Sequence, residues 1–133
     1  MDTPNERVAA CSCGQLTART RGEPVRVSIC HCLACQRRTG GVFSAQARFP
    51  RDEVELDGES RTHSLVGDEG TRAHFHFCPA CGGTVYYLME ALPDMVAIPV
   101  GAFADPGFPA PVVSVYGNRK HDWVRLPEGI EQM

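Results

Sequence analysis

The sequence predicts a mainly β fold of short antiparallel strands. Runs rich in Val, Ile, Thr, Phe and Tyr recur about every ten residues, and Gly and Pro, present 13 and 10 times, separate them. Several runs alternate apolar with polar residues, so that Val25, Val27 and Ile29 would share one face of a strand. Helix signals are weak by comparison. This spacing is typical of an antiparallel all-β architecture.

Eight runs are interpreted as strands: 15–21, 24–30, 42–49, 62–66, 72–78, 84–89, 95–100 and 111–116. One short helix or turn is predicted after Cys32, in LACQRRTGG, because Gly40 and Gly41 are typical of residues that close a helix. The segment 67–70, GDEG, is expected to form a turn between strands.

Length, charge and hydropathy limit the possible classes of protein. The 133 residues fit a single domain, residues 1–133. The formal net charge is −3, whereas nucleic-acid-binding proteins usually carry a basic excess, so we expect no nucleic-acid partner. No apolar run approaches the roughly 20 residues that cross a bilayer, and MDTPNERVAA is no secretory signal. We therefore expect a cytoplasmic protein without a membrane partner; the oligomeric state stays open.

Seven cysteines occur in three groups. A dense and odd number of clustered thiols in a reducing compartment favours metal binding over disulfides. The groups are CSCG at 11–14, CHCLAC at 30–35 and CPACG at 78–82, which contain Cys11, Cys13, Cys30, Cys32, Cys35, Cys78 and Cys81.

The first and last groups together predict a structural zinc site. A C-x-x-C pair followed by Gly forms a knuckle whose backbone N–H groups point at the sulfurs, and CSCG is a tighter version. Four thiols, from Cys11, Cys13, Cys78 and Cys81, would complete a closed tetrahedral zinc site. A thioredoxin-type redox pair in the last group is disfavoured, because the GGTVYYLM segment that follows is strand-like.

The middle group offers three thiols, in Cys30, Cys32 and Cys35. Zinc with three protein ligands and one open position is the catalytic pattern. In an alternative zinc ribbon, Cys32 and Cys35 would pair with the last group, although 42 residues separate the two pairs and ribbons usually have about 15–20. The three-thiol site is favoured, and the ribbon and an iron-containing four-thiol site stay open.

The motifs CSCG, CHCLACQRRTGG and HFCPACGG, in that order, resemble the glutathione-dependent formaldehyde-activating enzyme family, which includes the centromere protein V-like proteins. The resemblance runs from about residue 8 to about residue 126 and includes all seven cysteines. It implies a Mss4-like antiparallel β fold, with structural zinc at the four-thiol site and catalytic zinc at Cys30, Cys32 and Cys35. It thereby favours the three-thiol site over the ribbon. The implied activity joins glutathione and formaldehyde into S-hydroxymethylglutathione, a carbon–sulfur lyase reaction.

Two arginines follow the three-thiol group directly. Three cysteinates on Zn²⁺ leave a net charge of −1, and an incoming thiolate makes it −2. Arg37 and Arg38 are predicted to bind substrate, by offsetting this charge or by holding a carboxylate. His31 is predicted to point away from the metal as a supporting group, and Trp123 is predicted to be a core residue.

The sequence thus predicts a zinc-dependent enzyme that acts on a small thiol, glutathione above all, and an aldehyde such as formaldehyde. Two zinc ions per chain are expected, and the ion of the three-thiol site should be the labile one because it has fewer protein ligands. Two alternatives are a non-catalytic β module stapled by zinc and a thiol-binding sensor that performs no turnover.

Overall fold

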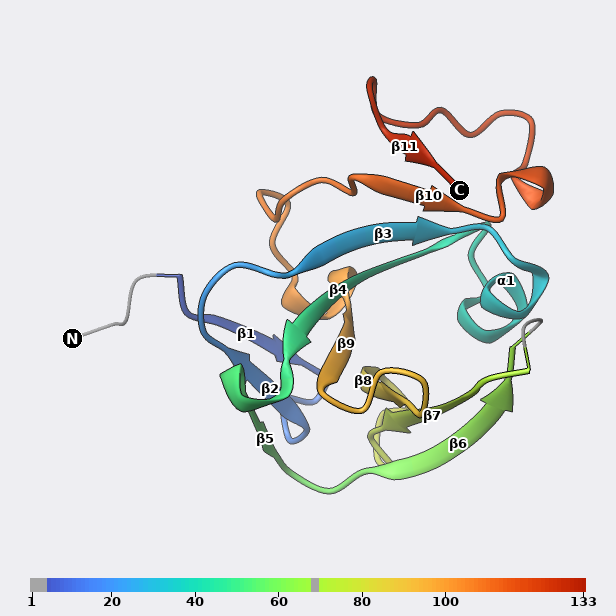
Figure 1. The fold of residues 1–133 in the computed structure, drawn as a ribbon. Helices are drawn as coiled ribbons and strands as arrows, with labels where there is room; N and C mark the ends of the chain where they lie inside the picture. Colours follow the sequence, from blue (N-terminus) through green and yellow to red (C-terminus); the bar gives the residue numbers. More distant parts are fainter. Residues whose placement is uncertain (1–4, 68–69) are drawn as a thin grey trace.

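The computed structural model describes residues 5–67 and 70–133, and these residues form two β-sheets with one α-helix (Figure 1). The small sheet has the order β1-β2-β5 and is antiparallel. The large sheet has the order β11-β10-β3-β4-β9-β8-β7-β6. The strands are β1 (Arg7–Ala10), β2 (Thr17–Thr20), β3 (Arg26–Cys30), β4 (Ser44–Pro50), β5 (Val54–Asp57), β6 (Arg61–Val66), β7 (Arg72–Phe77), β8 (Thr84–Met89), β9 (Met95–Pro99), β10 (Val113–Val115) and β11 (Glu131–Gln132).

The predicted mainly β fold is confirmed, and each of the eight predicted strands has a counterpart. Three short strands, β1, β5 and β11, were not predicted. Most pairings are antiparallel, but β10 pairs in parallel with both β3 and β11. Parallel neighbours need a long connection, and the chain returns to β3 through the segment 100–112. In the predicted turn at 67–70, Asp68 and Glu69 lie outside the described residues.

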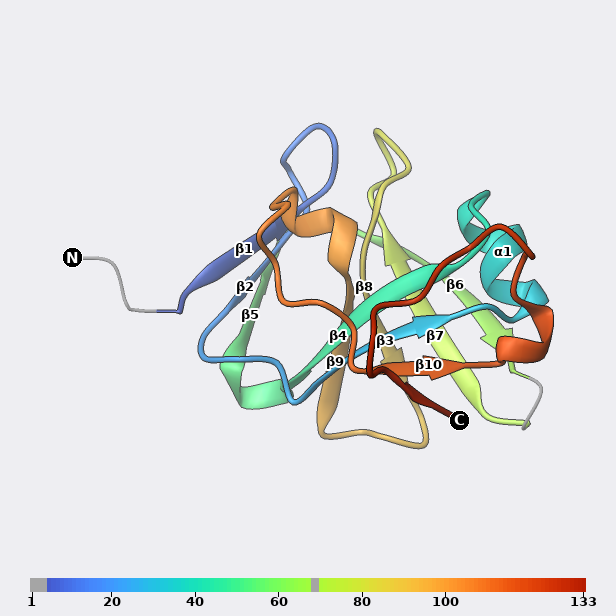
Figure 2. The same ribbon diagram turned by 90° about the horizontal axis from the view of Figure 1, so that it is seen from above.

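The main core lies between the small sheet and one face of the large sheet (Figure 2). Ala9 and Ala18 come from the small sheet, and Val27, Phe49 and Ile98 come from β3, β4 and β9 of the large one; all five are at most 4% exposed. Period-two alternation accounts for this, because every second side chain of a strand points to the same face. The residues between them on β3 and β4 therefore face the opposite side of the large sheet.

On that opposite side, one continuous row of side chains crosses five neighbouring strands. The register pairs Arg26 with Arg48, Arg48 with Ala97, Ala97 with Tyr87, and Tyr87 with Phe75. The last three form a second, smaller apolar cluster. This face of the sheet therefore has an apolar end on β7–β9 and a cationic end on β3 and β4.

The helix α1 (Leu33–Thr39) follows β3 immediately and covers one end of the β3–β4 pair (Figure 1). Cys32 is its N-cap, and the Cys32 side chain accepts a hydrogen bond from the Cys35 backbone N–H at 3.2 Å. Gly40 ends the helix, as predicted from the sequence, and it has a left-handed conformation. None of the helices in the described parts of the chain is long and apolar enough to cross a membrane.

Gly58, which follows β5, lies so close to Gln15 that a substitution there tests the fold. Its φ is +99°, and an added Cβ would lie 2.0 Å from the backbone oxygen of Gln15. Gly58→Ala should lower the free energy of unfolding by about 3 kcal/mol or more, because strain and a backbone clash act together. Chemical denaturation at constant metal content measures the effect.

Two other glycines serve as matched controls. Gly22→Ala adds a left-handed residue in open space and should cost about 1 kcal/mol. Gly101→Ala adds a methyl group in open space without a positive φ and should stay within about 0.5 kcal/mol of wild type. Equal stability of all three variants would contradict the close approach of Gly58 to Gln15.

Candidate metal centres and the adjoining pocket

The structure brings the sulfur atoms of Cys11, Cys13, Cys78 and Cys81 to within 4.8 Å of one another. We call this the four-thiol cluster. The Cys13 sulfur lies 3.6 Å from the sulfurs of both Cys11 and Cys78. All seven cysteines are free thiols. Four thiols therefore meet from two distant segments, after β1 and after β7, without a disulfide between them.

Backbone turns aim donors at these sulfurs. The N–H of Leu16 donates to Cys11 Sγ at 3.3 Å, and the N–H of Ala80 donates to Cys78 Sγ at the same distance. Gly82, with φ +82°, closes the second turn by donating its N–H to the Cys78 carbonyl. N–H groups that converge on sulfur stabilise its thiolate form, which is the form that binds metal.

Gln15 links the four-thiol cluster to the rest of the fold. Its side-chain amide nitrogen donates to Cys78 Sγ at 3.0 Å and to the Glu59 carbonyl at 2.7 Å. The backbone N–H of Cys81 and the Gln15 amide lower the pKa of the Cys78 thiol to about 6. The two turns also pack tightly, since a Cβ on Gly83 would lie 3.3 Å from the Cys11 Cβ. A charged, metal-binding sulfur is favoured at this position.

The remaining cysteines, Cys30, Cys32 and Cys35, form a second group with sulfurs within 4.8 Å of one another. We call it the three-thiol cluster. Cys30 ends β3, and the other two cap and begin α1. The Cys30 thiol, by hydrogen bonding, lowers the pKa of the Cys35 thiol to about 5. The grouping is four and three, and the pairing of a zinc ribbon does not occur among the described residues.

Both clusters fit a soft metal ion. Zinc–sulfur bonds of about 2.3 Å in a tetrahedron place sulfurs about 3.8 Å apart, close to the 3.6 Å contacts of the four-thiol cluster. The donors are all thiols, which select zinc and similar soft ions over magnesium or calcium. The four-thiol cluster supplies a complete tetrahedral set, and the three-thiol cluster supplies one ligand fewer.

His31 lies between Cys30 and Cys32 in the sequence and helps to anchor the loop of the three-thiol cluster. The side chain is fully buried, and its Nε2 lies 3.1 Å from the Ser114 hydroxyl on β10, while its backbone N–H donates to the Val115 carbonyl. Gln36 of α1 donates to the His31 carbonyl at 2.9 Å and to the Arg119 carbonyl at 3.1 Å. His31 therefore points away from the thiols, and the loop is tied to the C-terminal segment.

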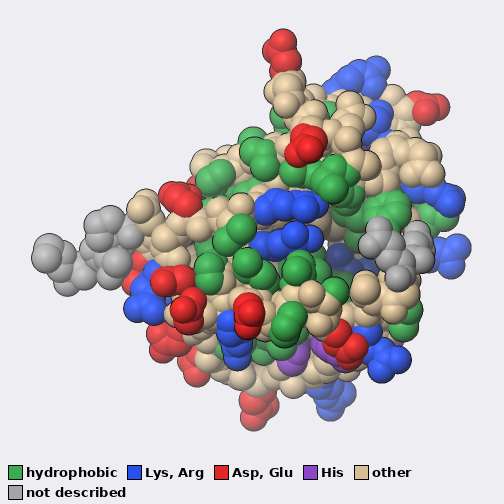
Figure 3. Space-filling view, in the orientation of Figure 1, with side chains coloured by type: hydrophobic (Ala, Val, Ile, Leu, Met, Phe, Trp, Pro, Cys, Tyr) green, Lys and Arg blue, Asp and Glu red, His purple; other side chains and the backbone are tan. Residues whose placement is uncertain are grey.

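A pocket of about 530 Å³ opens beside the three-thiol cluster. Cys30 and Cys35 line it, whereas Cys32 does not. The space-filling view shows the face of the molecule with the pocket as a hollowed surface (Figure 3). Lys and Arg side chains lie near the middle of this face, among hydrophobic ones. The lining residues are Arg26, Ser28, Cys30, Cys35, Arg38, Gln46, Arg48, Phe75, Tyr87, Val115, Tyr116, Asn118 and Met133.

The two arginines singled out from the sequence have different surroundings. The Arg38 guanidinium lies over the rings of Phe75 and Tyr87, 4.2 Å and 5.8 Å from their centroids, and it lines the pocket. Arg37 is exposed and is not among the lining residues. Successive residues of a helix point about 100° apart, so only one of the two faces the pocket.

Sequence reasoning missed Arg26, Arg48 and Tyr116. Period two relates Arg26 to Cys30 along β3, and this signal could have placed Arg26 on the cysteine's face. Arg48 could be found only from the register with β3. Tyr116 lines the pocket in the left-handed conformation, with φ 56°, an uncommon one for an aromatic residue. No sequence signal indicates it.

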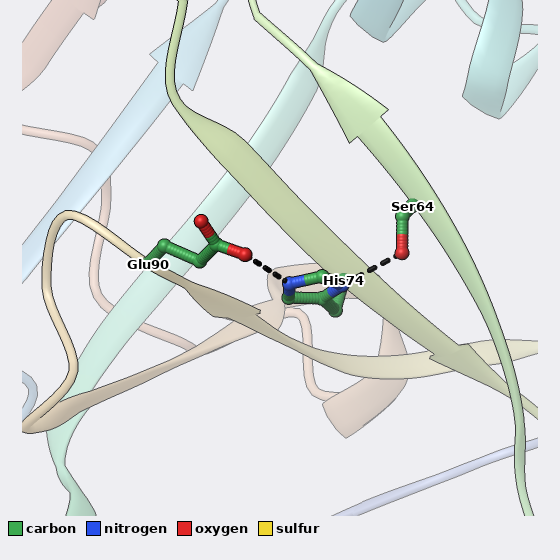
Figure 4. A network of polar contacts seen from close by, with 3 residues as sticks. All are labelled: Ser64, His74 and Glu90. Carbon is green, nitrogen blue, oxygen red and sulfur yellow. Dashed lines mark hydrogen bonds and ion pairs between the residues drawn. The ribbon is translucent and has the colours of Figure 1, made fainter.

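Other histidines and the tryptophan lie outside the pocket lining. His74 stands between Ser64 and Glu90, with its Nδ1 2.6 Å from the hydroxyl and its Nε2 2.9 Å from the carboxylate (Figure 4). His76 stacks on Tyr86. The prediction that Trp123 is a core residue is wrong, because its side chain is 67% exposed. It belongs to a C-terminal segment with little regular structure, so no sheet face covers the indole.

Both the fold and the sequence of this chain are similar to those of known proteins. A crystal structure of a Rhodobacter sphaeroides protein is similar in fold, with a TM-score of 0.56 and 19% sequence identity over 75% of this chain and 88% of that one. The family described as glutathione-dependent formaldehyde-activating enzyme matches residues 6–119, which include both clusters. Because the match spans most of the sequence, the chain belongs to the glutathione-dependent formaldehyde-activating enzyme family.

Proposed function

We propose that this protein is a zinc-dependent enzyme that joins a small thiol, glutathione above all, to an aldehyde such as formaldehyde. The reaction is of the carbon–sulfur lyase type. The observation that carries the proposal is the three-thiol cluster, two of whose cysteines line a pocket of about 530 Å³ that also has arginines in its lining. Membership of the family supports the choice of thiol and aldehyde. Reduced thiols require a reducing compartment such as the cytoplasm.

The two clusters are assigned different zinc ions. Cys11, Cys13, Cys78 and Cys81 would hold a structural ion, because four protein thiols leave no position for a substrate. Cys30, Cys32 and Cys35 would hold the catalytic ion. Zinc in such a three-thiol site offers a further ligand position and favours the thiolate form of a thiol that occupies it.

The residues around the pocket have defined roles in this proposal. Cys30 and Cys35 fix where the substrate sulfur lies. The Arg38 guanidinium, held on the face of Phe75, supplies positive charge close to the cluster. The Ser44 hydroxyl lies within hydrogen-bonding reach of the Cys35 sulfur and of Gln46 Oε1 at 3.0 Å. In this proposal, Arg38 is the group that meets the negative charge of the substrate.

The chemistry balances without a further reactant. The substrate thiol gives up its proton, and its sulfur forms a bond with the carbonyl carbon of the aldehyde. The C=O electron pair moves to oxygen, and this oxygen takes up a proton to give the S-hydroxymethyl product. Arg38 can stabilise the negative charge on that oxygen, and the pocket holds the two reactants together.

The assignment of the zinc ions predicts unequal effects of two cysteine substitutions. Cys81→Ser should strongly destabilise or unfold the protein, because structural zinc supplies folding energy directly. Cys35→Ser should leave the fold largely intact and remove the more labile ion. Zinc quantitation and thermal melts under reducing conditions measure both effects.

Ser12→Ala is a matched control, since Ser12 is an exposed neighbour of two ligands in the first turn. It should keep both ions and the wild-type melting temperature. If Cys81→Ser and Cys35→Ser lowered the melting temperature equally, the division into structural and catalytic ions would be wrong. Iron in place of zinc would also contradict the assignment.

Turnover tests the function directly. The protein should accelerate exchange between formaldehyde plus glutathione and S-hydroxymethylglutathione, as measured by NMR exchange spectroscopy. In cobalt-substituted protein, glutathione should change the visible spectrum, because a further sulfur enters the three-thiol site. Cys35→Ser should abolish both effects and still hold cobalt in the four-thiol cluster.

The outcomes separate the candidate functions. A spectral change without turnover would favour a thiol-binding sensor. No response of the cobalt spectrum to any thiol at millimolar concentration would leave only a zinc-stapled module, and the enzyme would be ruled out.

Arg37 and Arg38 provide a matched pair for a further prediction. Arg38→Ala should reduce kcat/KM by about tenfold or more, because it removes a guanidinium that lines the pocket. Arg37→Ala should stay within about twofold of wild type, because Arg37 is exposed outside the pocket lining. Steady-state kinetics at equal zinc content measures both, and equal losses would exclude a special role of Arg38.

A further inference from the structure

A ladder of six paired residues on β3 and β4 forms the floor of the pocket, and all of them except Ser44 line it. Cys30 pairs with Ser44 at one end, Ser28 pairs with Gln46 in the middle, and Arg26 pairs with Arg48 at the other end. All these side chains lie on the face opposite the main core, where Val27 and Ala47 are buried. The ladder therefore joins the three-thiol cluster at one end to two guanidinium groups at the other.

The middle rung of the ladder has its own hydrogen bonds. Ser44 donates to Gln46 Oε1 at 3.0 Å, and Gln46 Nε2 donates to Ser28 Oγ at 2.8 Å. The three side chains are at most 8% exposed. Because these polar groups are already paired, they do not need a ligand. Of the ladder's side chains, Arg26 at the arginine end has a buried nitrogen without a hydrogen-bond partner among the described residues.

The arginine end is unfavourable without a partner. Like charges directly opposite each other on neighbouring strands destabilise a sheet, and Arg26 and Arg48 are such a pair. No carboxylate forms an ion pair with either one within residues 5–67 and 70–133. The Nε atom of Arg26 is buried and has no hydrogen-bond partner. Burial, followed by the charge of Arg26, lowers the pKa of Arg48.

The pair has no carboxylate side chain beside it in the pocket lining formed by residues 5–67 and 70–133. Asp and Glu are absent from the described residues that line the pocket, whereas Arg38 adds a third guanidinium. Tyr87 and Phe75 continue the row of Arg48 through Ala97 and give the pocket an aromatic wall. A cationic site with one apolar wall and an unsatisfied donor is suited to an organic anion.

We propose that Arg26 and Arg48 form an anion-binding subsite that recognises an acidic group of the substrate, remote from its sulfur. That the substrate is a thiol rests on the proposed function, whereas the binding of an anion rests on the arginine pair alone. The acidic group is a carboxylate or a phosphate, since two guanidinium groups bind either in bidentate fashion.

The ladder also sets the length of the substrate. Arg26 and Cys30 are four residues apart along β3, which places their Cα atoms about 13 Å apart at 3.3 Å per residue. The arginine side chain shortens this span, but a carboxylate two or three bonds from the sulfur does not reach the pair. The subsite therefore discriminates between long acidic thiols and short ones as well as between acidic and neutral thiols.

The first experiment measures the subsite without a thiol. S-methylglutathione carries carboxylates but no free thiol, and its binding to the zinc-loaded protein is followed by calorimetry. Arg26→Gln and Arg48→Gln should each weaken this binding by about tenfold or more, and Arg37→Gln should leave it unchanged. Cys35→Ser should retain it. Binding that is equal in all four variants would overturn the proposal.

Competition identifies the acidic group. Inorganic phosphate that displaces S-methylglutathione at lower concentration than succinate assigns a phosphate-bearing substrate, and the reverse order assigns a carboxylate. Displacement by either ion should be lost in Arg26→Gln. If neither ion competes at high millimolar concentration and low ionic strength, the pair is no anion subsite.

Two further measurements separate this proposal from its alternatives. Removing one of two opposed charges should leave the melting temperature unchanged or raise it, whereas a purely structural role of Arg26 would lower it. In the cobalt protein, Arg26→Gln should weaken the response to glutathione about tenfold and leave the responses to 2-mercaptoethanol and 3-mercaptopropionate unchanged.

Failure of this proposal differs from failure of the proposed function. A cobalt response to glutathione that is indifferent to both arginines would overturn the subsite and leave the thiol site standing. Arginine-dependent binding of S-methylglutathione without any cobalt response to thiols would support the anion subsite and overturn the proposed thiol site.

Discussion

The pairing register of β3 with β4 is the constraint on which the rest of the structure depends. It sets Val27 and Ala47 into the main core, and it places Cys30 and Arg26 on the opposite face. A shift by one residue would move the arginines into the apolar core, which would be very costly in free energy. Burial on one face therefore enforces the arrangement of reactive and charged groups on the other.

The four-thiol cluster connects the small sheet with the β7–β8 end of the large sheet. It joins the turn after β1 to the turn between β7 and β8, and Gln15 extends the connection to Glu59 beyond β5. The small sheet and the β7–β8 end of the large sheet also share the main core, through Ala9 and Ala18 on one side and Val85 and Tyr86 on the other. The aromatic wall of the pocket, Phe75 and Tyr87, stands on those same strands, so its position depends on the cluster as well.

Most strands could be predicted from local sequence patterns. The features that were not predicted depend on pairing between distant segments. The strands of five or more residues were all recognised from composition and spacing, and the shorter β2 and β10 were recognised within longer runs of strand-like composition. The four-residue segments β1 and β5, RVAA and VELD, do not lie in such a run. The parallel position of β10 depends on a contact between segments more than 80 residues apart. The C-x-C and C-x-x-C spacings indicated metal binding because ligand geometry is local.

The charged residues of the pocket could be predicted from the sequence only in part for the same reason, because their positions depend on contacts between distant segments. Which of Arg37 and Arg38 faces the pocket depends on the orientation of α1, which Gln36 fixes through contacts with His31 and Arg119. A sequence optimised for stability alone would not set Arg26 opposite Arg48, because each guanidinium raises the free energy of the other. Natural proteins break such local rules mainly at functional sites. The chain has a net charge of −3 and yet gathers three arginines in one pocket. Under the proposal of an anion subsite, these guanidinium groups would attract an anionic ligand, and the pairing of β3 with β4 would hold Arg26 and Arg48 in position for it.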